Sequence, residues 1–162
     1  MPAGQMITPC LWFETETLEA AEFYASVFPN SAIVHALRSP ADTPGPKAGS
    51  VLLVQFRLAG QDYQALNGGR HEAFSNAVSL SVSCEDQAEV DRLWSALTAD
   101  GGRPVACGWL KDKYGLSWQI VPRRLPELLA DPDPDRARRA MEAMMTMVKI
   151  DIAAVEAAAA AR

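Results

Sequence analysis

The chain has 162 residues, of which 49% are hydrophobic and 22% are charged, and its formal net charge is -5. A nucleic-acid-binding domain normally carries a basic stripe, whereas Lys and Arg are scattered here outside segment 123–139, so we expect no nucleic-acid partner. The longest apolar runs are too short to cross a bilayer, and the N-terminus lacks a basic segment followed by an apolar core. We therefore expect a cytoplasmic protein with no membrane partner.

The cysteines and histidines limit the chemistry that the chain can support. Cys10, Cys84 and Cys107 are odd in number and include no Cys-x-x-Cys pair, which fits neither a disulfide framework nor a zinc site. We interpret them as free thiols. The sequence has only two histidines, His35 and His71, so the usual imidazole ligands and bases are scarce.

The first half predicts one β-α-β-β-β unit. Residues 6–13 form a short apolar run typical of a strand. Residues 17–28 place apolar side chains at three- and four-residue steps, as an amphipathic helix does, and Thr17 is placed to cap that helix. A proline-rich loop and a two-residue break at Ala59-Gly60 separate the later strands, the second break being typical of a hairpin. These strands are expected at 31–38, 50–58 and 61–67.

The second half predicts the same order again. Its helix starts at Asp86, which is followed three residues later by Glu89 as in a capping box, and it ends at Gly101-Gly102. The low identity between the halves does not hide the repeated order of elements, which indicates an internal duplication. The strands of this half are expected at 77–84, 103–112 and 116–122.

The C-terminal tail, residues 126–162, predicts helices. Its Asp-Pro steps place a capping residue before a proline in the first turn. Methionines are frequent on one predicted helical face, which suits an irregular subunit interface. That face contains Ala137, Ala140, Met141, Met144, Met145 and Val148.

The segment "CGWLKDKYGLSWQIVP" is the strongest candidate for a site. Strand alternation places Gln119 on one face and Trp118 on the other. The same alternation predicts that Trp109 shares the face of Gln119 and that Cys107 shares it too. Two interpretations stay open: the hairpin is ordinary core, or it is an aromatic-walled pocket in which one amide and one thiol orient a ligand.

Two β-α-β-β-β units containing "ITPCLWF", "QALNGG" and "CGWLKDKYGLSWQIVP" in this order resemble the PhnB-like proteins. These belong to the vicinal oxygen chelate superfamily, which includes glyoxalase I, bleomycin-resistance proteins and extradiol dioxygenases. Many relatives carry the label 3-demethylubiquinone-9 3-methyltransferase. The resemblance covers residues from about Met6 to about Ile152.

The resemblance implies an α+β fold of the glyoxalase/bleomycin-resistance type, within a single domain 1–162. Two βαβββ modules, 6–70 and 72–122, would curl into a half-open barrel around a cavity and be followed by C-terminal helices. Because each half-barrel would expose apolar strand faces, we expect a homodimer held together by those faces and by the Met-rich helix.

The resemblance also implies where a superfamily metal would bind, on the first and last strand of each module. None of these positions holds His, Glu or Asp, and proline, serine and glutamine are poor ligands for zinc, nickel or iron. We therefore expect no metal and no other cofactor. The positions are Pro9 or its neighbours Thr8 and Cys10, Tyr63 or Gln64, Ser79, and Gln119.

Three functions are compatible with this resemblance. A methyltransferase that uses S-adenosylmethionine usually has a glycine-rich turn between a strand and the next helix, and this sequence has none. A lyase or isomerase needs a base, for which His71, Glu72, Cys107 and Asp112 are candidates. We favour a metal-free small-molecule-binding protein with an apolar or aromatic ligand that has few polar groups. Its expected ligand-binding side chains are Trp12, Tyr63, Asn67, His71, Cys107, Trp109 and Gln119.

Overall fold

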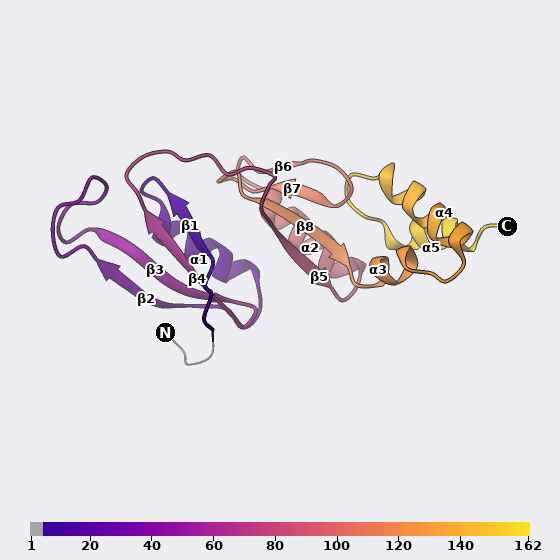
Figure 1. Cartoon of the computed structure of the whole chain (residues 1–162), viewed down its shortest axis with the longest axis horizontal. Coiled ribbons are helices and arrows are strands. Elements are labelled where there is room, and N and C mark those ends of the chain that lie inside the picture. The colour runs from indigo at the N-terminus through magenta and orange to yellow at the C-terminus, as the bar shows by residue number, and fades with distance from the viewer. Residues whose placement is uncertain (1–4) are drawn as a thin grey trace. The chain divides into compact units, whose positions relative to one another are not determined.

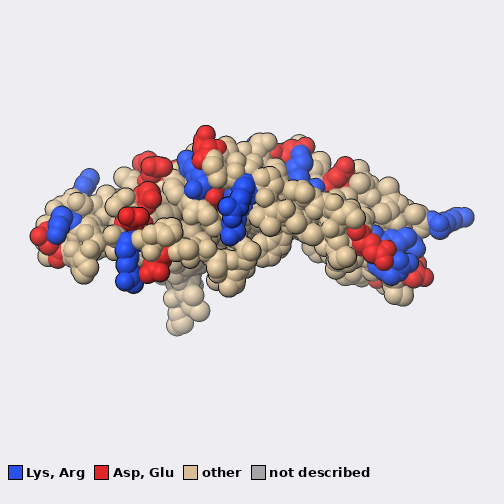
Figure 2. Space-filling model, turned by 90° about the horizontal axis from the view of Figure 1, so that it is seen from above, with Lys and Arg blue, Asp and Glu red and all other residues tan. Residues whose placement is uncertain are grey.

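A computed structural model describes residues 5–162 and shows the order β-α-β-β-β twice, followed by three helices (Figure 1). The chain forms two compact units, one ending at Ala73 and the other beginning at Phe74. The predicted α+β architecture of two modules and a helical tail is confirmed. Every helix within residues 5–162 is too short or too polar to traverse a bilayer. On the face drawn in Figure 2, basic and acidic side chains are intermingled and form no continuous basic stripe.

The first unit is a four-stranded sheet with one helix on one face. In space the strands follow the order β1-β4-β3-β2, with the β1–β4 pair parallel and the others antiparallel. Alternate strand residues pack under the helix, and these include Leu11, Val54 and Ala65, which are 8%, 0% and 0% exposed. The elements are β1 (Cys10–Phe13), α1 (Thr17–Val27), β2 (Ala32–Arg38), β3 (Val51–Leu58) and β4 (Gln61–Asn67).

The second unit contains a sheet of the same kind, in the order β5-β8-β7-β6. The predicted cap at Asp86 is confirmed, since its carboxylate accepts a hydrogen bond from the Glu89 N–H at 2.9 Å. The Glu89 carboxylate reaches one residue further back than in a capping box and accepts a hydrogen bond from the Glu85 N–H at 3.4 Å. Leu93 and Ile120 are buried between helix and sheet. The elements are β5 (Ser79–Cys84), α2 (Gln87–Thr98), β6 (Arg103–Pro104), β7 (Trp109–Lys111) and β8 (Ser117–Pro122).

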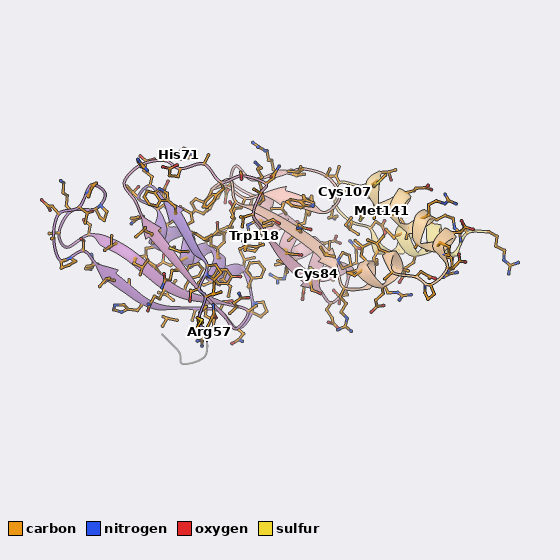
Figure 3. All side chains as sticks on the ribbon, in the orientation of Figure 1. Arg57, His71, Cys84, Cys107, Trp118 and Met141 are labelled. Atoms are coloured by element: carbon orange, nitrogen blue, oxygen red, sulfur yellow. The ribbon has the colours of Figure 1, made fainter. Side chains whose placement is uncertain are left out.

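The tail forms the expected helices and belongs to the second unit. Asp133 caps the middle helix by accepting hydrogen bonds from the N–H groups of Asp135 and Arg136, and Pro134 occupies its first turn. Met141 is 41% exposed on the outer side of this helix (Figure 3). The helices are α3 (Arg124–Leu129), α4 (Pro134–Met145) and α5 (Ile152–Ala160), and their shared core is Leu125, Leu128, Ala140, Ile150, Val155 and Ala159.

One predicted strand was wrong. Segment 103–112 is not continuous but consists of the short strands β6 and β7 with a bend between them. Cys107 has φ 53° and Gly108 has φ 83°, so both lie in the left-handed region, where a strand cannot continue. The backbone N–H groups of these two residues donate to the tail instead of to a neighbouring strand.

Candidate functional site

Each sheet has one face turned away from its helix, and on the second sheet this open face carries the candidate site. The strand register pairs Trp109 with Gln119 and Gln119 with Ser81, so these side chains share the face opposite Trp118. The predicted common face of Trp109 and Gln119 is therefore confirmed. We call Ser79, Trp109 and Gln119 the Trp109–Gln119 site.

Hydrogen bonding in this site leaves two polar groups uncommitted. The amide nitrogen of Gln119 donates to the Ser79 hydroxyl at 2.9 Å, which fixes the orientation of the amide. Among residues 5–162, no protein group bonds to the Gln119 carbonyl oxygen or to the Trp109 indole N–H. Both side chains are half-buried. The site therefore offers one acceptor, one donor and the face of an aromatic ring.

The opposite face of the same hairpin is held by a buried carboxylate. Asp112 is 2% exposed and accepts hydrogen bonds from the N–H groups of Tyr114 and Leu116 at 2.9 and 3.1 Å. It also accepts one from the Trp118 indole N–H at 2.9 Å, and Trp118 is itself buried (Figure 3). These contacts give Asp112 a structural role and take it away from the open face, so it is not placed to act as a base there.

Trp12 lies on the open face of the first sheet, but its polar group is already used. Its indole N–H donates to the Arg70 carbonyl oxygen at 2.9 Å, and the Arg70 guanidinium lies 5.9 Å from the ring centroid. The ring packs where Gly68 has no side chain, since a Cβ there would lie 1.8 Å from Cζ2 of Trp12. The turn continues at Gly69 (φ 76°), where a Cβ would lie 2.3 Å from Cα of Gly45.

Tyr63 and Asn67, both expected to bind ligand, lie on the side of the sheet that α1 covers. Tyr63 is stacked on buried Phe56, with ring centroids 5.6 Å apart, and burial raises the pKa of its hydroxyl. Asn67 is 7% exposed and accepts a hydrogen bond from the Thr17 N–H at 3.0 Å. Its amide nitrogen donates to the Val51 carbonyl oxygen at 3.0 Å. Asn67 thus caps α1, a role that was expected of Thr17. Both the oxygen and the nitrogen of its side-chain amide have protein partners.

His71 and Cys107, also expected to bind ligand, belong to different units, His71 to the first and Cys107 to the second. His71 is exposed in the segment that follows β4 (Figure 3). Cys107 lies in the bend before β7, where its N–H donates to the Met147 carbonyl oxygen at 2.9 Å. Its thiol donates to the Met145 carbonyl oxygen at 3.9 Å. The left-handed backbone of Cys107 breaks the alternation that predicted a common face with Trp109. We therefore do not count His71 or Cys107 among the residues of the Trp109–Gln119 site.

The sequence profile of the 3-demethylubiquinone-9 3-methyltransferase family matches residues 5–121. The chain belongs to this family. A PhnB protein of Bacillus cereus that carries the same methyltransferase name is 35% identical in sequence, with a TM-score of 0.65. The alignment covers 73% of this chain and 99% of that PhnB protein.

More distant structures show the fold alone. A Pseudomonas aeruginosa protein is 21% identical with a TM-score of 0.57, over 71% of this chain and 95% of that protein. A fosfomycin resistance protein of Listeria monocytogenes, solved with Mn(II) and sulfate, is 16% identical with a TM-score of 0.50. That alignment covers 80% of this chain and 98% of the Listeria protein. A search of the curated proteins gave no match. The PhnB-like chain therefore has the glyoxalase/bleomycin-resistance fold.

The resemblance to the vicinal oxygen chelate superfamily implies a metal, and the residues of this PhnB-like chain do not fit one. On the first sheet, the open-face residues at the expected positions are Cys10 and Gln64, which are register partners. On the second sheet they are Ser79 and Gln119, which are bonded to each other. No three His, Cys, Asp or Glu side chains within residues 5–162 come together as a metal cluster. We derive no chemical step through a metal.

The three thiols of the PhnB-like chain are unpaired. Cys84 is fully buried, and burial, aided by the nearby Glu89 carboxylate, raises its pKa to about 11. Partial burial also raises the pKa of Cys10. A thiol with a raised pKa is a poor nucleophile at neutral pH, so neither residue is suited to covalent chemistry.

A cavity that the sequence did not predict lies in the first unit, with a volume of about 650 Å³. It opens at the start of α1 and is bounded by the loop before β3. The sequence signal was the acidic run "ETETLE" before and within that helix, but acidic residues at a helix start are also common for purely structural reasons. Its lining includes Glu14, Glu16, Glu19, Arg38 and also Asn67, which was expected to bind ligand.

Proposed function

We propose that this PhnB-like chain is a cytoplasmic, metal-free small-molecule-binding protein whose ligand is apolar or aromatic and has one or two polar groups. The observation that carries the proposal is the pair of uncommitted polar groups beside a half-buried aromatic ring. The Trp109 ring supplies contact area, and the Gln119 amide, held by Ser79, supplies an orienting hydrogen bond. A fixed amide loses little conformational freedom when a ligand binds, which favours affinity.

Binding is favoured over lyase or isomerase chemistry because neither of the two candidate bases in the second unit is positioned on its open face. Of the four candidate bases, Asp112 is buried on the other face and Cys107 is turned toward the tail. His71 and Glu72 are exposed in the connecting segment, where Glu72 forms an ion pair with Arg70 at 3.0 Å. General base catalysis needs a base within hydrogen-bonding reach of the substrate proton.

The methyltransferase activity in the family name has less support from these residues. A glycine-rich turn between strand and helix would let the backbone approach S-adenosylmethionine closely. The β1–α1 turn is instead Glu14-Thr15-Glu16, and the β5–α2 turn is Glu85-Asp86. Neither contains glycine, so the residues present do not fit this cofactor, and no step is derived through it.

The test is a thermal-shift screen of S-adenosylmethionine, quinone precursors, 2-oxo acids and aromatic antibiotics. We expect an aromatic compound to raise the melting temperature of the wild-type protein, and Trp109→Ala and Gln119→Ala to abolish that shift. Ser81→Ala is the matched control, because Ser81 is exposed on the same face next to Gln119. Stabilisation by S-adenosylmethionine together with methyl transfer to a quinone precursor would refute the proposal.

A further inference from the structure

The C-terminal helices lie outside the part of the chain that the family shares. The family profile ends at residue 121, and the Bacillus cereus PhnB protein aligns over 99% of its own length while leaving 27% of this chain uncovered. The connection between α4 and α5, taken with the first residue of α5 as residues 146–152, nevertheless contacts the shared module at two places. We call this connection the strap.

The first contact joins the strap to the bend before β7. The Cys107 N–H donates to the Met147 carbonyl oxygen at 2.9 Å, and the Gly108 N–H donates to that of Val148 at 2.8 Å. Ile150 packs so closely on this bend that a Cβ on Gly108 would lie 3.1 Å from its Cγ1 atom. The left-handed backbone of the bend is therefore supported by bonds to the tail.

The second contact joins the strap to α2. The Gln87 amide nitrogen donates to the Ile150 carbonyl oxygen at 2.9 Å, and the Gln87 amide oxygen accepts from the Ile152 N–H at 3.0 Å. Lys149 adds an ion pair with Asp91 at 2.7 Å. Ile150 itself is fully buried, so the strap is held on both sides of its centre.

The bend that the strap supports leads directly into the candidate site. Gly108 accepts a hydrogen bond from the Ile120 N–H at 2.8 Å, next to Gln119 on β8. The Trp109 N–H donates to the Ala106 carbonyl oxygen at 2.9 Å, within the bend itself. The backbone of Trp109 is thus fixed on one side by its pairing with Gln119 and on the other by a bend bonded to the strap.

We propose that the strap positions Trp109 for ligand binding, so that a C-terminal segment outside the family region sets the affinity of the site. This inference rests on the proposed function. Gln87 is the positioning residue: it lies on α2, on the other side of the sheet from the open face, and acts through the strap. Side chains of a site must be held closely by their surroundings for full affinity, and here the tail supplies part of that support.

The test uses the full chain and the dye 8-anilinonaphthalene-1-sulfonate, an aromatic probe with polar groups. Gln87→Ala removes both hydrogen bonds to the strap and should weaken dye binding about fivefold. Gln87→Glu keeps the acceptor for the Ile152 N–H, so it should lose less dye affinity than Gln87→Ala. Gln61→Ala is the matched control, because Gln61 is exposed in β4, and it should bind the dye like the wild type.

A spectroscopic measurement separates positioning from general loosening. The fluorescence of Trp109 is obtained by subtracting the spectrum of Trp109→Phe from that of its parent, for both the wild type and Gln87→Ala. We expect acrylamide to quench Trp109 more strongly in Gln87→Ala, with the circular dichroism spectrum unchanged. Lys149→Ala, which removes only the ion pair to Asp91, provides a milder second variant.

The outcomes distinguish the two proposals. If Trp109→Ala loses dye binding while Gln87→Ala and Lys149→Ala bind like the wild type with unchanged quenching, the strap does not position Trp109 and the inference is overturned. If Trp109→Ala binds the dye like the wild type, the proposed binding site is itself wrong.

Discussion

Replacing Asn67 tests whether this residue is structural or binds ligand. Asn67→Ala removes the acceptor for the Thr17 N–H at the start of α1 and the donor to the Val51 carbonyl oxygen. Loss of a helix cap costs about 1 kcal/mol. Loss of a buried hydrogen bond that leaves its partner unsatisfied costs about 1–2 kcal/mol. We expect the free energy of unfolding to fall by about 2–3 kcal/mol.

The assay is urea denaturation followed by circular dichroism, where this loss should lower the midpoint by roughly 1–2 M. Asn67→Asp keeps the acceptor for the Thr17 N–H, so its free energy of unfolding should fall by about half as much as that of Asn67→Ala. Gln61→Ala is the control, because Gln61 is an exposed amide side chain on the same strand as Asn67. If Asn67→Ala unfolds like the wild type but no longer responds to an aromatic ligand, the structural role is refuted.

Four further predictions follow from the same structure. Asp112→Ala should lower the free energy of unfolding by about 3–5 kcal/mol. A double-mutant cycle with Trp118→Phe should give a coupling energy of about 1–2 kcal/mol, because the two side chains are hydrogen-bonded. If the two effects were additive, this hydrogen bond would not contribute to stability. The folded state raises the pKa of Cys84 from 9.0 to about 11, so its contribution to stability should be constant below pH 9 and decline from there to pH 11. If the free energy of unfolding is measured over this pH range for the wild type and for Cys84→Ala, the variant should lack the part of the decline that comes from Cys84. Sedimentation at micromolar concentration should show a homodimer, for which exposed Met141 and Met145 are interface candidates, and a monomer would count against it. Elemental analysis after purification without chelator should find no stoichiometric zinc, nickel or iron, whereas about one ion per chain would overturn the argument from the donor set.

Local sequence patterns were sufficient to predict the order of elements. The cap at Asp86 and the alternation around Gln119 depend on neighbours within a few residues, and both predictions were confirmed. The partner of Gln119, by contrast, is Ser79 on a strand 40 residues earlier. Local periodicity predicts which face a side chain occupies but not which distant group it meets.

The errors occurred where distant contacts decide the local structure. Segment 103–112 has the composition of a strand, but the bend at Cys107 is bonded to a strap about 40 residues later. The cap of α1 was expected from Thr17 but comes from Asn67, 50 residues away along the chain. The sequence left open whether Tyr63 or Gln64 occupies the expected ligand position on β4. A register shift of one residue moves every side chain of a strand to the other face, so local pattern alone could not decide between them.

The contact between Gly45 and Gly69 restricts how the loop before β3 can change in length. A Cβ on Gly45 would lie 2.8 Å from the carbonyl carbon of Gly68, and one on Gly69 would lie 2.3 Å from Cα of Gly45. Both obstacles are backbone atoms, so no compensating side-chain change elsewhere can make room. Insertions and deletions should therefore be accepted only where Gly45 keeps its contact with the turn. The loop is thus attached at one fixed point to the turn that follows β4, although its composition gives no sign of that attachment.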